Sequence, residues 1–66
     1  MTTERFLRIG QVRDITGLPQ SSIYEAVAKG EFPRQVRLGP QRVAWVESEI
    51  RQWQANRIAE RDEAAA

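Results

Sequence analysis

The sequence predicts a small α+β fold in which three helices pack with a short two-stranded hairpin. Three patterns indicate it: two short amphipathic helical segments around a break at 16–19, two β-type runs around a turn at 39–41, and a longer helical pattern after residue 46. Helix, tight turn, helix and basic hairpin is the order of a winged helix-turn-helix.

The length of the chain bounds its organisation. With 66 residues there is room for one domain with one small core. The chain contains no Cys and no His, so packing rather than a disulfide or a metal is expected to hold it together. We expect residues 5–60 to form the folded domain, residues 1–4 to be disordered and residues 61–66 to be a frayed tail.

The first helix is predicted over residues 11–16. Val12 and Ile15 are three residues apart and are expected to share its buried face. Gly17 is expected to end the helix because glycine accepts a positive φ, and Leu18 can then fold back onto the helix.

The second helix is predicted to begin at Pro19 or Gln20 and to end at Lys29-Gly30. A later start is the alternative, since Ser22 and Glu25 have the spacing of a capping box. The face expected to pack on the core contains Ile23, Ala26 and Val27.

Two segments are predicted to be extended. Residues 5–9 alternate loosely as a short strand, whose Phe6 or Leu7 is expected to reach the core. Residues 34–46 read as a hairpin around Gly39-Pro40-Gln41. Because side chains alternate along a strand, Val36 and Leu38 are expected on one face of the first strand, and Gln35 and Arg37 on the other. In the second strand Val43 and Trp45 are expected on one face, and Arg42 and Ala44 on the other.

The last helix is predicted from about Glu47 to Ala59 or Glu60, with Ile50 and Trp53 as its buried pair. Phe32 is also expected in the core. Both tryptophans are expected to be core residues rather than platforms for stacking bases, because so small a domain has little else to bury.

The charge is divided unevenly along the chain. The net charge is only +1, but residues 1–46 carry seven Arg or Lys against four Asp or Glu, whereas residues 47–66 carry three against five. The basic excess coincides with the helix-turn-helix and hairpin. It favours a double-stranded DNA partner for that part of the chain.

The polar start of the second helix is the predicted reading element, because residues 20–29 would enter the major groove. Gln20 can pair with adenine, and Ser21 or Ser22 can reach a base or a phosphate, although serine at a helix start is often a cap. Tyr24 can donate to a phosphate or pack at the rim of the core.

The hairpin is expected to meet the neighbouring backbone or the minor groove through guanidinium and ammonium groups. The alternative is a solvated charged face that protects an edge strand from pairing. The predicted contacts are Lys29, Arg34, Arg37 and Arg42.

Other function classes find little support in the composition. The chain lacks His and Cys, a paired-carboxylate motif and a glycine-rich phosphate loop, so we expect no enzyme, cofactor, metal or small-molecule ligand. The longest apolar run is Val43–Val46, and the start lacks the pattern of a signal peptide, so a cytoplasmic protein without a membrane partner is expected.

A combination of short strings resembles the AlpA family of phage and prophage regulators. They comprise the turn and Ser-x-Ile-Tyr helix in 16–24, the Phe-Pro in 30–33, and the Trp-x-x-x-Glu-Ile run in 43–53, together with 9–12 and 36–39. The resemblance spans about residues 5 to 57. Pro19 departs from it, because the family commonly has a capping serine there, and Ser21 or Ser22 are the possible substitutes.

The resemblance implies a winged helix-turn-helix related to MerR-type regulators and excisionases. It places Gln20, Ser21, Ser22 and Tyr24 on the recognition helix and Arg37, Gln41 and Arg42 around the wing. The implied function is a DNA-binding transcriptional regulator, or alternatively a recombination directionality factor. A protein-binding adaptor of the same fold is the further alternative. Self-association on repeated DNA sites is expected, because one such module is small.

Overall fold

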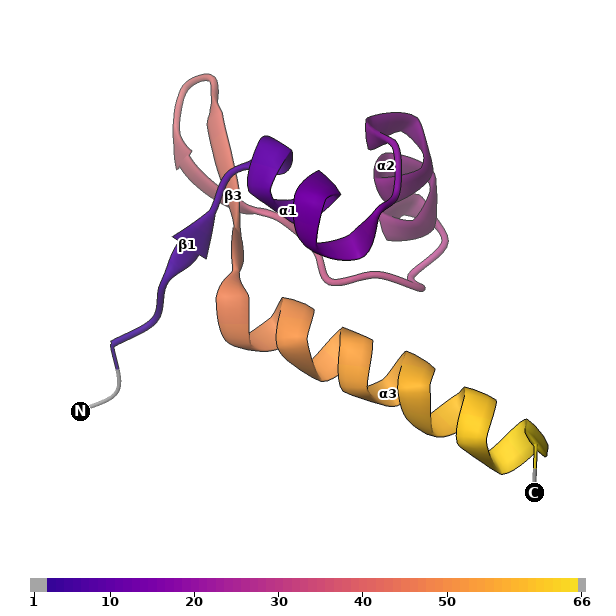
Figure 1. Ribbon diagram of the computed structural model, residues 1–66. Helices are drawn as coiled ribbons and strands as arrows, with labels where there is room; N and C mark the ends of the chain where they lie inside the picture. The colour runs from indigo at the N-terminus through magenta and orange to yellow at the C-terminus, as the bar shows by residue number, and fades with distance from the viewer. Residues whose placement is uncertain (1–2, 66) are drawn as a thin grey trace.

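The computed structural model describes residues 3–65, which form three helices and three strands (Figure 1). In chain order these are β1 (Phe6–Leu7), α1 (Ile9–Thr16), α2 (Gln20–Ala28), β2 (Val36–Gly39), β3 (Arg42–Val46) and α3 (Glu47–Ala65). The predicted α+β fold, including the short N-terminal strand, is confirmed. The disorder predicted for residues 1–4 falls partly outside the described residues, and Glu4 accepts a hydrogen bond from Ser48 Oγ at 3.0 Å.

Helix α1 begins two residues earlier than predicted and ends where Gly17 was expected to end it. At its start the Gln11 side chain accepts a hydrogen bond from the Arg8 backbone N–H at 2.9 Å, so this donor is satisfied. At its end Gly17 adopts φ 73°, a left-handed conformation that favours glycine. Its N–H donates to the Arg13 carbonyl at 2.8 Å.

Helix α2 follows after the three residues 17–19 and begins at Gln20, with Pro19 as its N-cap at φ −69°. This is the earlier of the two predicted starts, and Ser22 lies inside the helix rather than capping it. Within residues 3–65 no side chain caps this N-terminus, so neither Ser21 nor Ser22 replaces the serine that Pro19 displaces.

The end of α2 is closed by backbone hydrogen bonds around Gly30, which has φ 73°. The Gly30 N–H donates to the Val27 carbonyl at 3.0 Å, and the Glu31 N–H donates to the Ala26 carbonyl at 2.9 Å. This pair of bonds is a Schellman motif, which satisfies the last helical carbonyls and turns the chain sharply toward β2.

The three strands form one antiparallel sheet in the order β1-β3-β2, so β3 is the central strand. Phe6 pairs with Val46 and Leu7 with Trp45 on one side, and on the other side Arg37 pairs with Val43. Ala44 and Trp45 are both fully buried, which shows that β3 is covered on both faces. Trp45 Nε1 donates to the Pro33 carbonyl at 2.9 Å.

The core draws side chains from almost every element. Leu7 rather than Phe6 is the residue of β1 that reaches it, and Trp53 packs against it while half-buried. The Phe32 and Trp53 rings meet edge to face at 4.8 Å between centroids. The buried cluster consists of Leu7, Val12, Ile23, Phe32, Trp45 and Ile50.

One predicted core contact is wrong, and the predicted alternation of the hairpin fails at Leu38. Ile15 is 41% exposed, because α1 turns the side formed by Ile9, Val12 and Thr16 inward and leaves Ile15 at the edge beside α3. Leu38 is 46% exposed, because the register between Arg37 and Gly39 is irregular and breaks the alternation that would have kept Leu38 with Val36.

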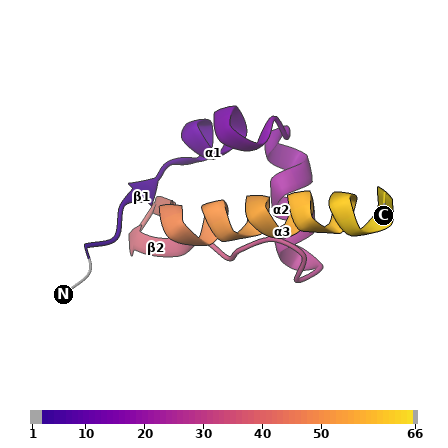
Figure 2. The ribbon, with the colours of Figure 1, turned by 60° about the horizontal axis from the view of Figure 1, so that its bottom comes forward.

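Helix α3 also differs from the prediction, since it continues to Ala65 instead of ending at Ala59 or Glu60. The residues predicted to be a frayed tail are thus helical as far as the structure describes them. Arg61 and Asp62 of this segment form an ion pair, and the i, i+3 pair of Arg57 with Glu60 lies just before it. The N and C termini lie at opposite ends of the molecule in both views (Figures 1 and 2).

β3 and α3 adjoin directly, since β3 ends at Val46 and α3 begins at Glu47. The Glu47 N–H donates to the Arg5 carbonyl at 2.8 Å, which fixes the junction to the chain just before β1. In Figure 1 the hairpin tip lies above and to the left of α1, α2 lies to the right of α1, and α3 lies below them. The molecule therefore has α1, α2 and the hairpin tip on one side, and α3 on the other.

Candidate nucleic-acid interface

The polar residues of the first half of α2 do not all lie on the same side of the helix. With 100° between successive residues, Ile23 faces the core and Gln20 and Tyr24 fall on one flank, with Ser21 on the outer face beside them. The Tyr24 ring is half-buried and meets Trp45 of β3 edge to face, at 5.9 Å between centroids. The flank with Gln20 and Tyr24 therefore faces the hairpin.

Two of the predicted wing arginines lie beside α2. Arg34 and Arg37 are both exposed and line a hollow of about 440 Å³ together with Val27 and Ala28, at the end of α2. The Arg37 Nε donates to the Gly39 carbonyl at 3.3 Å, which holds that side chain along the hairpin. The structure thus brings Arg34 and Arg37 to the helix that was predicted to read DNA.

Gln41 and Arg42 lie elsewhere, at the tip of the hairpin, and both are exposed. Arg42 opposes Gly39, and Arg37 opposes Val43, the residue after Arg42. Successive residues of a strand point to opposite faces, so Arg42 lies on the face opposite to Arg37. The two arginines are therefore placed to contact different parts of a ligand.

Ser22 and Lys29 fall on the other flank of α2, away from the hairpin. They line a small hollow together with Glu25 and Glu31. Lys29 Nζ lies 3.0 Å from Glu25 Oε1, one helical turn earlier. The structure does not bring these two predicted contacts together with the hairpin, and it surrounds them with carboxylates.

The cationic side chains divide into two groups by their partners. Five of them lie within 4.0 Å of a carboxylate: Arg5, Lys29, Arg51, Arg57 and Arg61. The arginines for which the described part of the chain offers no ion pair are Arg8, Arg13, Arg34, Arg37 and Arg42. All five lie before residue 43, whereas every arginine of α3 is paired.

Arg8 and Arg13 were not among the predicted contacts. The signal that could have found Arg13 is the lack of Asp or Glu three or four residues away in α1, whereas Arg51 and Arg57 of α3 each have an acid at that spacing. The net charge of a segment does not reveal this difference, because an arginine in an ion pair and an arginine without one each count as +1.

The chemistry that these side chains offer is electrostatic. Over residues 3–65 no three His, Cys, Asp or Glu side chains gather as metal ligands do. The same residues include no buried charged or polar side chain. Exposed guanidinium groups bind phosphate through paired hydrogen bonds, so the arrangement suits an extended anion. In that same range, no helix has the length and apolar character needed to cross a membrane.

The arrangement of α1, tight turn, α2 and the β2–β3 hairpin defines a small winged helix-turn-helix protein. The family model described as "Prophage CP4-57 regulatory protein (AlpA)" matches residues 5–58. The chain belongs to this family of prophage regulatory proteins, as the strings in the sequence indicated.

One curated relative supports the assignment. The chain is 54% identical over 61 residues to "Uncharacterized protein ORF88" of Enterobacteria phage P4. The alignment covers 92% of this chain and 69% of the phage protein. No solved structure matches the chain.

Proposed function

We propose that this chain binds double-stranded DNA in a sequence-specific manner and acts as a phage or prophage transcriptional regulator. In this proposal α2 enters the major groove, and segment 34–46 lies against the adjacent backbone or the minor groove. The observation that carries it is the distribution of arginines without ion pairs, which gather on α1, the segment before β2 and the hairpin. Membership of a family of prophage regulatory proteins supports it.

The flank of α2 that faces the hairpin carries the proposed base contacts. Gln20 is exposed in the first turn of α2, where its amide can pair with adenine, and Ser21 lies next to it. Tyr24 packs against Trp45 through its ring, so its role is a phosphate contact at the rim of the interface.

Phosphate contacts are assigned to Arg34 and Arg37 beside α2, and to Gln41 and Arg42 at the hairpin tip. Ser22 and Lys29 are kept as backbone contacts at the far flank of α2. Lys29 must leave Glu25 to make such a contact, which costs little because exposed ion pairs contribute about 0–1 kcal/mol.

The test is the salt dependence of binding to labelled duplexes, measured by fluorescence anisotropy. If Lys29, Arg34, Arg37 and Arg42 each neutralise one phosphate, log K is expected to fall against log salt with a slope of about −3.6. A flat dependence, or no binding at low salt, would contradict the DNA proposal and favour the protein-binding adaptor. Selection from a random duplex pool would then give the preferred sequence.

The size of the module bears on how it occupies its site. One module of this kind buries roughly 600–1,000 Å² of protein surface, which limits its specificity. We therefore expect two or more copies on repeated or palindromic sites, visible as a stoichiometry above one per duplex. Strong bending of attachment-site DNA, together with support for excision in a recombination assay, would instead favour a recombination directionality factor. The proposed role requires no catalytic group, cofactor or small-molecule ligand.

A further inference from the structure

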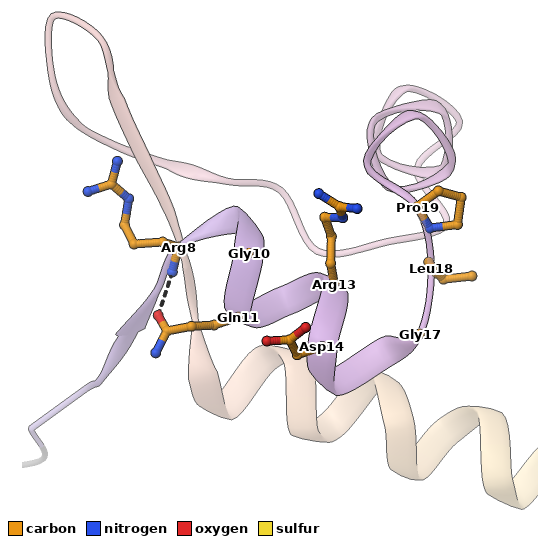
Figure 3. Close-up of a pocket in the computed structure, with 8 residues that line it drawn as sticks. All are labelled: Arg8, Gly10, Gln11, Arg13, Asp14, Gly17, Leu18 and Pro19. Atoms are coloured by element: carbon orange, nitrogen blue, oxygen red, sulfur yellow. Dashed lines mark hydrogen bonds between the residues drawn. The ribbon is translucent and has the colours of Figure 1, made fainter.

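The outer surface of α1 forms an open hollow of about 820 Å³ that no predicted contact occupies (Figure 3). Arg8 lies at one end of it, Arg13 lines its middle, and its other end is formed by the turn 17–19. Pro19, the last residue of that turn, is the N-cap of α2. The hollow therefore connects the start of α1 to the start of the proposed recognition helix.

The charge in this hollow is positive. Arg8 and Arg13 are both exposed, and neither has an ion pair within residues 3–65, although Asp14 also lines the hollow. Figure 3 shows the two guanidinium groups projecting to the same side of α1, away from α3, while the Asp14 carboxylate lies below them in that view. An anion approaching from the side of α2 and the hairpin therefore meets the arginines.

The floor of the hollow is open as well. Gly10 lines it between the two arginines, and a Cβ placed on this glycine would meet nothing within 4 Å. The Gln11 side chain is engaged with the Arg8 backbone N–H, so it stays at the edge of the hollow. A phosphate group can thus come close to the first turn of α1 without displacing a side chain.

We propose that Arg8 and Arg13 each hold a phosphate of the duplex backbone, and that together they form an anchoring subsite separate from α2 and the hairpin. This inference rests on the proposed DNA-binding function. Contacts to phosphate fix the position and orientation of a protein on the duplex without reading its sequence. An anchor on α1 that adjoins the N-cap of α2 sets how α2 enters the groove.

The test compares two double variants that each remove two arginines. Arg8→Ala with Arg13→Ala removes the unpaired arginines of the hollow, and Arg57→Ala with Arg61→Ala removes two paired arginines of α3. Log K is measured against log salt for a selected duplex and a scrambled one. We expect the first variant to lose up to about 1.8 from the magnitude of the slope, about 0.9 per phosphate contact, and to weaken equally on both duplexes. We expect the α3 variant to keep the wild-type slope.

The possible failures are distinguishable. If the wild-type chain binds no duplex, the proposed function and this inference fail together. If the wild-type chain binds with a steep slope and the Arg8, Arg13 variant keeps it, the inference fails alone. Equal losses in both double variants would also overturn it, since they would show an effect of total charge.

Two control measurements accompany the salt titrations. All four arginines are exposed, and circular dichroism melts are expected to show that each variant folds as the wild type does. Inorganic phosphate is compared with chloride at equal ionic strength, because the subsite chemistry is shared by free phosphate. If the arginines hold backbone phosphate, inorganic phosphate should reduce the difference between wild type and the Arg8, Arg13 variant more than chloride does. If inorganic phosphate binds the wild-type chain through these arginines but the double variant loses no duplex affinity in chloride, the hollow takes a free anion and the backbone subsite is overturned.

Discussion

Two regions of this molecule carry arginine, and they differ in what the guanidinium groups contact. In α3, Arg51, Arg57 and Arg61 lie 3.7, 3.2 and 2.9 Å from carboxylate oxygens of nearby residues of the same helix. In the region of α1, α2 and the hairpin, five arginines have no such partner among the described residues. Exposed ion pairs contribute little to stability. The difference between the two regions therefore concerns their capacity to bind an anion rather than the stability of the fold.

The largest expected effect comes from the core that both regions share. Trp45 is fully buried, packs against Tyr24 and donates a hydrogen bond to Pro33. Trp45→Ala is expected to cost about 3–5 kcal/mol of unfolding free energy. A core of this size rarely supplies more than about 3–5 kcal/mol, so the variant should show no cooperative thermal transition by circular dichroism. The matched control is Leu38→Ala on the exposed hairpin, expected within about 0.5 kcal/mol of wild type.

The comparison of the two regions is tested most directly by two triple variants of equal charge. Replacing Arg34, Arg37 and Arg42 with Ala should reduce the magnitude of the salt slope by about 2.7. The same replacement of Arg51, Arg57 and Arg61 should leave the slope unchanged. Anisotropy titrations at several salt concentrations measure both, and a similar loss in the two variants would remove the distinction between the regions.

A smaller effect is expected from the glycine that closes α2. Gly30 has φ 73°, where an added Cβ costs about 1–2 kcal/mol whatever space surrounds it, so Gly30→Ala should lower the melting temperature. Gly10 lies in α1 with open space around it, and Gly10→Ala should stabilise the domain by about 0.5–1 kcal/mol. Shifts of the same sign in the two melts would show that helix capping is not what Gly30 contributes.

The smallest effect is expected at the end of α3. Residues 61–65 are exposed, and the ion pair between Arg61 and Asp62 lies within the helix itself. Ending the chain after Glu60 should change the unfolding free energy by less than about 0.5 kcal/mol and leave duplex binding intact. A larger loss, measured by denaturant titration, would show that the last turns of α3 contribute to the domain.

Much of the fold could be predicted because its local signals agree with one another. Gly17 and Pro19 mark the boundary between α1 and α2, and Gly30 marks the end of α2, through backbone requirements that do not depend on tertiary contacts. Leu7, Ile23 and Ile50 reach the core as their periodicity indicated.

The sequence predictions of burial and helix length fail where they depend on how the elements pack together. Val12 and Ile15 fit a helical face equally well, and only the position of α1 against β3 selects Val12. An irregularity in the register beside Leu38 leaves no trace in the residue pattern, so alternation misplaces this side chain. The length of α3 was underestimated because fraying was assumed for polar residues that in fact continue the helix.

The sequence could predict which residues are candidates for the interface, but not which of them lie on the same side of the molecule. The sequence predicts contacts at Arg34, Arg37 and the start of α2, and the structure places these two arginines at a hollow bordered by α2. It could not show that Ser22 and Lys29 lie on the other flank, because helical phase fixes a side only once the position of the hairpin is known. Nor could it separate arginines with carboxylate partners from those without.

The direct junction of β3 and α3 fixes the orientation of the hairpin relative to the C-terminal helix. Val46 and Glu47 are consecutive, so there is no linker in which the hairpin could swing independently of the C-terminal helix. Ile50, one turn further along, is fixed in the core. The orientation of the hairpin is therefore set by α3, which is itself anchored in the core through Ile50.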